Sequence, residues 1–263
     1  MDSELQTAID AAHVAGDLLR RKLPLERQVR YKGPRDIVTD ADEAAQRAIL
    51  ELIGARFPAH EILAEESPHD TLRDLAASGP TWIVDPLDGT TNYARRYPAF
   101  CVSIGLADAG ALRVGAIYDP VRRETFYAAA GQGAFLQRGR ARAQPLRVSP
   151  TGDLAEALVG VDWARDPDVR AQVLAVLGNV ASACRSVRAS GSAALALAYL
   201  AAGWLDAYFH FSLSPWDIAA GALLIQEAGG RITTPAGSPW QLGQPAVAAS
   251  NGLLHTAFLE TIG

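Results

Sequence analysis

The sequence predicts an α/β (α+β) fold, because two regions of the chain carry different patterns of strands and helices. In residues 1–147, an opening helix is followed by strand-like runs and short turns, which are typical of an antiparallel meander. In residues 148–263, strands and helices alternate, which favours an α/β layer. With 263 residues and a 49% hydrophobic composition, the chain can bury a sizeable core. We expect the two regions to form one compact unit.

The N-terminal segment predicts an amphipathic helix that ends near Pro24. Its apolar residues, such as Leu5 and Ile9, recur at helical spacing. The segment is acidic where an export signal would be basic, so we expect a cytoplasmic protein. The most apolar segment, residues 189–204, is shorter than the roughly 20 residues that span a bilayer. We therefore expect no membrane association and a buried helix in this segment.

The following segments predict a short strand, a helix and then a series of strands. The helix has a cap at Thr39 or Asp40 and ends before Pro58. Two strand-like runs, EILAEE and TWIVD, each end in acidic residues. The meander is predicted to comprise strands over 99–106, 112–118 and 124–130, with turns at Asp108–Gly110 and Asp119–Pro120 between them.

From about Pro150 onward, strands and helices are predicted to alternate. The expected strands are ALVGV, residues 185–188 and LDAYFHF, and the expected helices cover 167–180, 192–202 and 216–228. The last helix has start signals at Ser214 and Pro215.

The charge and the cysteine content limit the classes of partner. A net charge of −5 argues against nucleic acid, which usually needs a basic surface. Cys101 and Cys184 are the only cysteines, and they show neither a disulfide framework nor a zinc pattern. We interpret both as core thiols in a reducing cytoplasm, and we expect the partner to be a small molecule.

Five acidic residues stand at the ends of predicted elements, where side chains converge most easily. A single aspartate at a helix start is usually a cap or a surface residue. However, Asp85 ends the apolar strand WIVD, and Asp217 precedes an almost wholly apolar helix. An unpaired charge at the edge of a core is costly, so each needs a partner. The five residues are Asp42, Glu65, Asp85, Asp88 and Asp217.

A metal ion is the partner that fits these acids best. All the candidate ligands are oxygens, which favours Mg²⁺ over zinc. Two such ions can lower the pKa of a bound water and neutralise a leaving oxygen. Thr90 has a hydroxyl that can orient the water, and the amides of Gly89 and Thr90 at a helix start can face a phosphate. The pattern therefore predicts metal-assisted phosphate chemistry.

Two other interpretations of the same turn stay open. VDPLDGT is similar to the aspartyl-phosphate motif of haloacid dehalogenase-type phosphatases, but that motif separates its aspartates by one residue. Here Pro86 and Leu87 both intervene. Alternatively, the chain is a magnesium-dependent binding or regulatory module without turnover. That alternative gives no reason for Thr90 beside a full set of acids.

Four segments together resemble the signatures of the inositol monophosphatase family. They are KGPRDIVTDAD, LAEE, WIVDPLDGTTNY and SPWDIAAGALLIQEAGG, and the GQGAF segment is also similar. The resemblance covers nearly the whole chain. It implies a layered sandwich of alternating helices and sheets, and a magnesium-dependent phosphomonoesterase that is usually a homodimer and often inhibited by lithium.

The resemblance also implies roles for individual residues. The metal ligands would be Glu65, Asp85, Asp88, Asp217 and the main-chain carbonyl of Leu87, holding two or three Mg²⁺ ions with Mn²⁺ as a possible substitute. Asp42 would act through metal-bound water, and Thr90 with Glu65 or Asp42 would help activate that water. Substrate contacts would come from Asp88, Gly89, Thr90, Gly191, Ser192, Ala193 and Asp217. Lys32 would lie on a mobile loop near the third metal.

One position departs from the family pattern. Inositol-directed members have a glutamate seven residues before the aspartate of the WD pair, where this chain has His210. His210 is either a substrate contact or a structural residue at a strand edge. An imidazole there would favour a more anionic substrate. The alternative substrates within the family are fructose 1,6-bisphosphate, adenosine 3′,5′-bisphosphate, NADP and histidinol phosphate.

The remaining histidines and an arginine pair show no catalytic pattern. We assign the four other histidines to the solvated surface: His13, His60, His69 and His255. Arg95 and Arg96 follow the predicted phosphate turn and are either a solvated pair or a means of drawing anions toward it.

Overall fold

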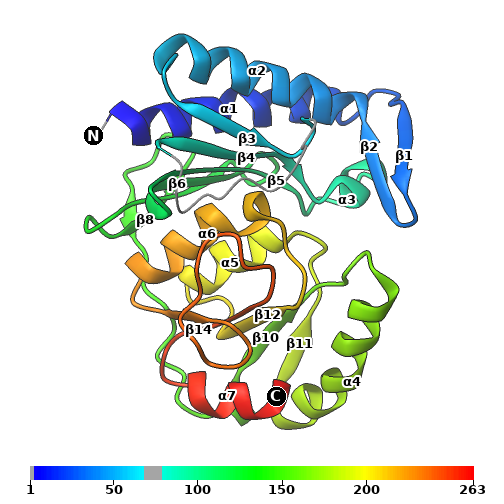
Figure 1. Ribbon diagram of the computed structural model, residues 1–263, viewed down its shortest axis with the longest axis vertical. Coiled ribbons are helices and arrows are strands. Elements are labelled where there is room, and N and C mark those ends of the chain that lie inside the picture. The colour runs from blue at the N-terminus through cyan, green and yellow to red at the C-terminus, as the bar shows by residue number, and fades with distance from the viewer. Residues whose placement is uncertain (1–2, 68–78) are drawn as a thin grey trace.

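Helices and sheets alternate in layers in the computed structural model, which describes residues 3–67 and 79–263 (Figure 1). From one end to the other, the layers are α1 (Ser3–Lys22) with α2 (Asp40–Arg56), a seven-stranded sheet, α5 (Ala193–Ala201) with α6 (Pro215–Glu227), a five-stranded sheet, and α4 (Pro167–Ala183) with α7 (His255–Ile262). This arrangement confirms the predicted fold class.

The seven-stranded sheet contains the predicted meander. Strand β3 is parallel to β4, and every later neighbouring pair is antiparallel. Strands β8 and β9 were not predicted, because β8 lies between the turn glycines Gly133 and Gly139 and β9 is only two residues long. In sheet order, the strands are β3 (Glu61–Ala64), β4 (Thr81–Asp88), β5 (Cys101–Asp108), β6 (Ala111–Asp119), β7 (Glu124–Ala129), β8 (Ala134–Arg138) and β9 (Gln144–Pro145).

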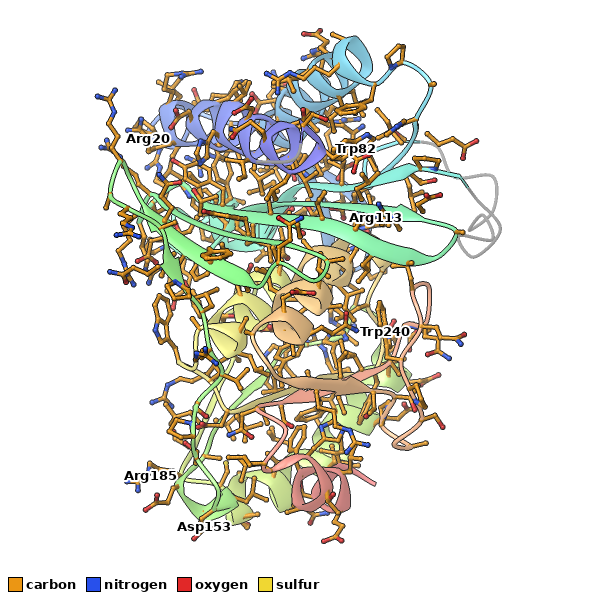
Figure 2. The ribbon with its side chains drawn as sticks, turned by 90° about the vertical axis from the view of Figure 1, so that its left-hand side faces the viewer. Arg20, Trp82, Arg113, Asp153, Arg185 and Trp240 are labelled. Atoms are coloured by element: carbon orange, nitrogen blue, oxygen red, sulfur yellow. The ribbon has the colours of Figure 1, made fainter. Side chains whose placement is uncertain are left out.

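Helices α1 and α2 cover one face of this sheet with small and aliphatic residues. Trp82 of β4 is fully buried beneath them, and its ring packs against Phe57 and His60. Side chains fill the space around the labelled Trp82 in Figure 2. The predicted cap at Thr39 is present, because the Thr39 side chain accepts a hydrogen bond from the Ala41 amide at 3.2 Å.

Helices α5 and α6 are buried between the two sheets, which explains their almost wholly apolar sequences. Glycines permit the close approach of these elements. A Cβ at Gly115 of β6 would lie 2.9 Å from the Ala220 backbone, and one at Gly221 would lie 2.5 Å from Leu197 Cβ. The predicted burial of this segment is therefore confirmed.

The five-stranded sheet is mixed. β10 lies parallel to its neighbours β11 and β12, whereas β14 is antiparallel to β12 and β13. The elements β13, β14 and α7 were not predicted. The two strands are three and four residues long and the helix is eight, and segments this short give little periodic signal. In sheet order, the strands are β11 (Ser186–Arg188), β10 (Leu158–Val161), β12 (Ala207–His210), β14 (Val247–Ser250) and β13 (Arg231–Thr233).

The assignment of histidines to the solvated surface was wrong. His255 is buried, and its ring nitrogens lie 2.9 Å from the hydroxyls of Thr233 and Ser250. His13 is half-buried, with Nε2 2.7 Å from the Thr125 hydroxyl, and His60 is half-buried against aromatic rings. A histidine can be buried when both of its ring nitrogens find hydrogen-bond partners. Those partners come from other parts of the chain, so an isolated histidine in the sequence does not show whether it is buried. His69 lies outside the described residues.

The two cysteines differ in burial, Cys101 being fully buried and Cys184 half-buried against the core of the second sheet. Within residues 3–67 and 79–263, no helix is long and apolar enough to cross a membrane.

Candidate active site

A β-bulge in β4 places two of the predicted acids on one face of the sheet. Between Asp85 and Asp88 the register of β4 against β5 shifts, at Pro86 and Leu87. In a regular strand, residues three apart point to opposite faces. Here Leu87 packs with α1 and α2, while Asp88 contacts the N-terminal end of α5 on the other face. The bulge therefore brings both carboxylates toward α5 and α6.

Asp217 completes a compact carboxylate cluster with these two residues. It is the third residue of α6, where its side chain accepts a hydrogen bond from the Ser214 amide at 2.7 Å. One carboxylate oxygen from each of Asp85, Asp88 and Asp217 lies within 4.8 Å of the others. Glu65 lines the same cavity from the end of β3 but is not part of this group. Convergent oxygen ligands are what a hard divalent cation requires.

Burial and mutual repulsion raise the pKa values of the cluster. Burial raises the pKa of Asp217 to about 8 and that of Asp88 to about 6, and neighbouring carboxylates add to both shifts. Burial, followed by the charges of Glu65, Asp88 and Asp217, raises the pKa of Asp85 well above its ordinary value. Such a group of acids is unfavourable without a cation, so these residues fit a bound metal.

Asp88 is held in place by the second half of the chain. Its Oδ2 accepts hydrogen bonds from the Ser192 hydroxyl and the Ala194 amide, both at 2.7 Å. Ser192 is 1% exposed, so its side chain serves Asp88 rather than the open cavity. Its neighbours Gly191 and Ala193 line the cavity.

Gly89 and Thr90 follow the bulge and open the five-residue helix α3 (Thr90–Ala94). Gly89 has φ 95°, and a Cβ there would lie 2.9 Å from the Ala99 carbonyl oxygen, so only glycine fits. The Thr90 hydroxyl lies 3.0 Å from Asp42 Oδ1 and 3.1 Å from the Leu87 carbonyl oxygen. Its single proton can be donated to either acceptor.

Asp42 lies behind Thr90 and is fully buried. It also accepts hydrogen bonds from the amide and hydroxyl of Thr39. Burial raises its pKa to about 7, against the opposing effect of these hydrogen bonds. Asp42 therefore reaches the cavity only through Thr90.

Two residues that were not predicted from the sequence hold the Gly191 turn. Asp162, buried at the end of β10, accepts a 2.6 Å hydrogen bond from the Gly191 amide. Asn92 of α3 donates to the carbonyls of Ala99 and Ser190 at 2.7 and 2.8 Å. Asp162 follows an apolar strand in the way that Asp85 does, so the same signal would have found it. Asn92 gave no comparable signal.

Two cations lie beside Glu65. Lys32 Nζ is 3.6 Å from Glu65 and 2.7 Å from Glu66. Arg165, which was not predicted, lies 3.4 Å from both Glu65 and Asp36. The structure places Lys32 in strand β1 (Val29–Gly33), paired with β2 (Asp36–Thr39), rather than in a loop. Lys32 was expected in a loop from the family resemblance, but the residues on both sides of the turn at Pro34 and Arg35 pair as β1 and β2.

Most of these groups line one cavity of about 1110 Å³ between the two halves of the chain, whereas Asp42, Ser192 and Lys32 do not line it. Asp85, Asp88, Asp217 and Glu65 form its acidic part. Arg95 lines it as well, whereas Arg96 donates to the Pro24 carbonyl at 3.3 Å. Two aromatic residues and three further arginines complete the wall: Tyr31, Trp163, Arg35, Arg165 and Arg170.

His210 lines the cavity as the last residue of β12. It is 4% exposed, and its Nδ1 accepts a hydrogen bond from the Ser212 amide at 3.0 Å. Burial lowers the pKa of His210 to about 4, so the ring is neutral near pH 7. Any preference of His210 for a more anionic substrate must therefore come from hydrogen bonding and from the loss of a carboxylate, not from a positive charge on the ring.

A layered fold with a buried acidic cluster and a cavity for a small molecule defines a metal-dependent enzyme site. A family model described as the inositol monophosphatase family matches residues 1–263, and the chain belongs to this family. It is 36% identical over 265 residues to inositol monophosphatase 1 of Solanum lycopersicum, covering 100% of this chain and 95% of that protein. It is 38% identical over 236 residues to Nus factor SuhB of Escherichia coli (strain K12), covering 89% and 85%.

Solved structures agree with this assignment. The extragenic suppressor protein suhB from Bartonella henselae matches with a TM-score of 0.91 and 34% identity, covering 99% of this chain and 98% of that one. Inositol monophosphatase from Anabaena matches with a TM-score of 0.85 and 39% identity, covering 99% and 95%. The chain is thus a metal-dependent phosphoric monoester hydrolase.

Proposed function

We propose that the enzyme hydrolyses a small phosphate monoester, of the kind represented by inositol monophosphate, with Mg²⁺ as its metal. The observation that carries this proposal is the buried cluster of Asp85, Asp88 and Asp217 in a cavity large enough for a phosphorylated polyol. SaIMPase-II, 26 to 28% identical to this chain, is a solved structure with inositol monophosphate and, separately, with 2'AMP bound. Both ligands support a small phosphorylated substrate.

The metal ligands in this proposal are the cluster, Glu65 and the carbonyl of Leu87. All five are oxygen donors, and each lines the cavity. Oxygen donors favour Mg²⁺, with Mn²⁺ as a substitute, and the number of ions in the proposal, two or three, rests on the family. When bound, the metal supplies positive charge that acidifies water and stabilises the leaving oxygen.

Thr90 and Asp42 position the attacking water in this proposal. If Thr90 Oγ1 donates its hydrogen bond to Asp42 Oδ1, 3.0 Å away, its lone pairs can accept a hydrogen bond from water in the cavity. Glu65, with its side chain 6% exposed at the cavity wall, is the second carboxylate available to that water. Asp42 is thus a positioning residue and Thr90 the group that touches water.

The substrate is held by the turns on both sides of the cluster. The amides of Gly89 and Thr90 precede the first hydrogen bond of α3, from the Tyr93 amide to the Gly89 carbonyl, so both can donate to phosphate oxygens. Gly191 and Ala193 form the opposite wall, and Ser192 supports it through Asp88.

A substrate panel tests the proposal directly. Phosphate release is measured with and without Mg²⁺ for inositol 1-phosphate, fructose 1,6-bisphosphate, adenosine 3′,5′-bisphosphate, NADP and histidinol phosphate. We expect magnesium-dependent release that disappears in Asp85→Asn. Full magnesium-dependent turnover by that variant would contradict the proposal, and a trapped phosphoenzyme would favour the aspartyl-phosphate mechanism instead.

The proposal includes three further properties, which we expect because the resemblance to the inositol monophosphatase family and the sequence favour them. We expect a homodimer in light scattering, inhibition by lithium in the phosphate-release assay, and a cytoplasmic location in cell fractionation. A monomer at working concentration, lithium-insensitive turnover or a membrane-bound fraction would each contradict the corresponding expectation.

A further inference from the structure

The neutral ring of His210 has a fixed arrangement of donor and acceptor. Its Nδ1 accepts a hydrogen bond from the Ser212 amide at 3.0 Å, so the proton of the neutral ring resides on Nε2. Within the described residues, no hydrogen bond to Nε2 is present. Because the residue is 4% exposed and lines the cavity, the Nε2–H can only be satisfied by what the cavity contains.

The strand β12 directs His210 toward the reacting groups. Along this strand, Tyr208 and His210 share one face, and Phe209 points to the other face, where it packs with Phe258. The Tyr208 hydroxyl lies 3.4 Å from Asp162, which also lines the cavity. His210 therefore faces the side of the sheet that holds the site.

We propose that His210 determines specificity by donating its Nε2–H to an anionic acceptor on the alcohol part of the substrate, a second phosphate or a carboxylate. A carboxylate at this position would bind hydroxyl donors and repel an anion. The neutral N–H of His210 has the opposite preference. It needs a hydrogen-bond acceptor on the substrate, and it carries no negative charge that would repel an anion. The inference rests on the proposed hydrolysis of a phosphate monoester.

The rest of the cavity wall supports an anionic substrate. Four arginines line it, and they offset the repulsion that the acidic cluster exerts on a second anionic group: Arg35, Arg95, Arg165 and Arg170. Arg170 stacks 6.0 Å from the ring centre of Trp163, which also lines the cavity. The volume of about 1110 Å³ leaves space for a substrate larger than a phosphate with a small alcohol.

The test compares His210→Glu and His210→Gln with the unmodified enzyme. For each, kcat/KM is measured for fructose 1,6-bisphosphate, adenosine 3′,5′-bisphosphate and inositol 1-phosphate. We expect Glu to lower the ratio of bisphosphate to monophosphate kcat/KM by about tenfold or more, mainly through KM. Gln keeps an N–H donor, so we expect a change of less than about threefold. His255→Gln is the matched control, because it removes another buried histidine outside the cavity, and it should leave the ratio unchanged.

Nitrogen NMR gives a readout that does not depend on turnover. In ¹⁵N-labelled enzyme, the signals lost in His210→Gln identify this ring, and we expect a protonated Nε2 and an unprotonated Nδ1 from pH 6 to pH 8. The opposite tautomer would overturn the inference about His210. An unchanged ratio of bisphosphate to monophosphate kcat/KM in His210→Glu would also overturn it, provided that this variant still hydrolyses inositol 1-phosphate. Neither result would contradict the proposed function. Absence of phosphate release from every substrate by the unmodified enzyme would instead overturn the proposed function.

Discussion

At the residue scale, we expect the acids proposed as metal ligands to destabilise the metal-free chain. Asp217 is buried near Asp85 and Asp88, and its pKa is raised to about 8, mainly by burial and then by the charge of Asp88. We predict that Asp217→Asn raises the Tm of the metal-free protein at pH 8, because Asn keeps the acceptor for the Ser214 amide and removes the charge. Each kcal/mol gained corresponds to about 2–4 °C. Thermal unfolding in a chelator measures this, and an unchanged or lower Tm would contradict it.

The same substitution has the opposite effect on function. We predict that Asp217→Asn lowers Mg²⁺ affinity and kcat/KM by about 100-fold or more, because Asp217 is a metal ligand in the proposed function and not merely a supporting contact. Calorimetric titration with Mg²⁺ and phosphate release give the two values. Glu260→Gln, an acid of α7 remote from the cavity, is the control and should change neither.

The raised pKa values also predict how stability depends on pH. Asp88, Asp42 and Asp217 have folded pKa values of about 6, 7 and 8, above the ordinary value of 3.8. The folded chain therefore binds more protons than the unfolded chain in this window, and these acids make the metal-free protein less stable as pH rises from about 4 to 8. His210 and His255, with pKa values lowered to about 4, oppose this trend below their ordinary 6.5.

Metal binding should release protons for the same reason. At pH 7, we expect Mg²⁺ to displace protons from the acidic cluster, so the titration enthalpy will vary with the ionisation enthalpy of the buffer. Identical enthalpies in phosphate-free buffers of different ionisation enthalpy would show that the acids are already ionised.

At the element scale, the contact between α5 and α6 depends on a missing side chain. We predict that Gly221→Ala lowers the free energy of unfolding by about 1–3 kcal/mol, because its Cβ would lie 2.5 Å from Leu197 Cβ. Gly178→Ala in the exposed part of α4 is the control: nothing lies within 4 Å of its Cβ, and we expect a gain of about 0.5–1 kcal/mol. Urea denaturation measures both. Equal effects would contradict the tight packing of the middle layer.

Elements with strong local signals were predicted correctly from the sequence, and those without them were not. Helix α6 has Ser214 and Pro215 at its start and a long apolar run, so its position and burial followed from sequence. Strand β14 is four residues long, with three small apolar side chains and a serine, and it is stabilised by pairing with β12 and β13, which no local pattern records.

The candidate site divides in the same way. Asp85, Asp88 and Asp217 stand at element ends, where sequence signals are strongest, and the structure brings them together. Asn92 and Arg165 act across the two halves of the chain, at 2.8 Å from the Ser190 carbonyl and 3.4 Å from Glu65. Such contacts depend on how the layers stack, which follows from tertiary packing rather than from spacing.

At the scale of the whole molecule, the site exists only where residues 1–147 meet residues 148–263. Asn92 is one of the residues that join them, since it donates to Ala99 on one side and Ser190 on the other. We predict that Asn92→Asp lowers stability by about 1–3 kcal/mol and raises KM, because a carboxylate would face carbonyl oxygens. Calorimetry and phosphate release test this, with Asn179→Asp in exposed α4 as the control.

The division at residue 147 remains a prediction about domains. We expect one calorimetric transition for the unmodified protein, because the middle helices pack on both sheets and Ser103 of β5 donates to the Trp216 carbonyl at 3.2 Å. Two separate transitions would show that the regions unfold independently.

The bulge at Pro86 and Leu87 constrains how this motif can change in length. Pro86 has no N–H to donate to the β4–β5 ladder, so the residue type itself favours an irregularity in the pairing at this position. Removing either residue would leave the two aspartates two apart, a spacing that a regular strand already presents on one face. β5 spans the same stretch in two steps, because Asp85 pairs with Ser103 and Asp88 with Cys101, so loss of one residue would give regular pairing and leave both aspartates opposite their present partners. A one-residue change in length would therefore turn the bulged pair of aspartates into a regular paired-aspartate strand without moving the rest of β4 along β5.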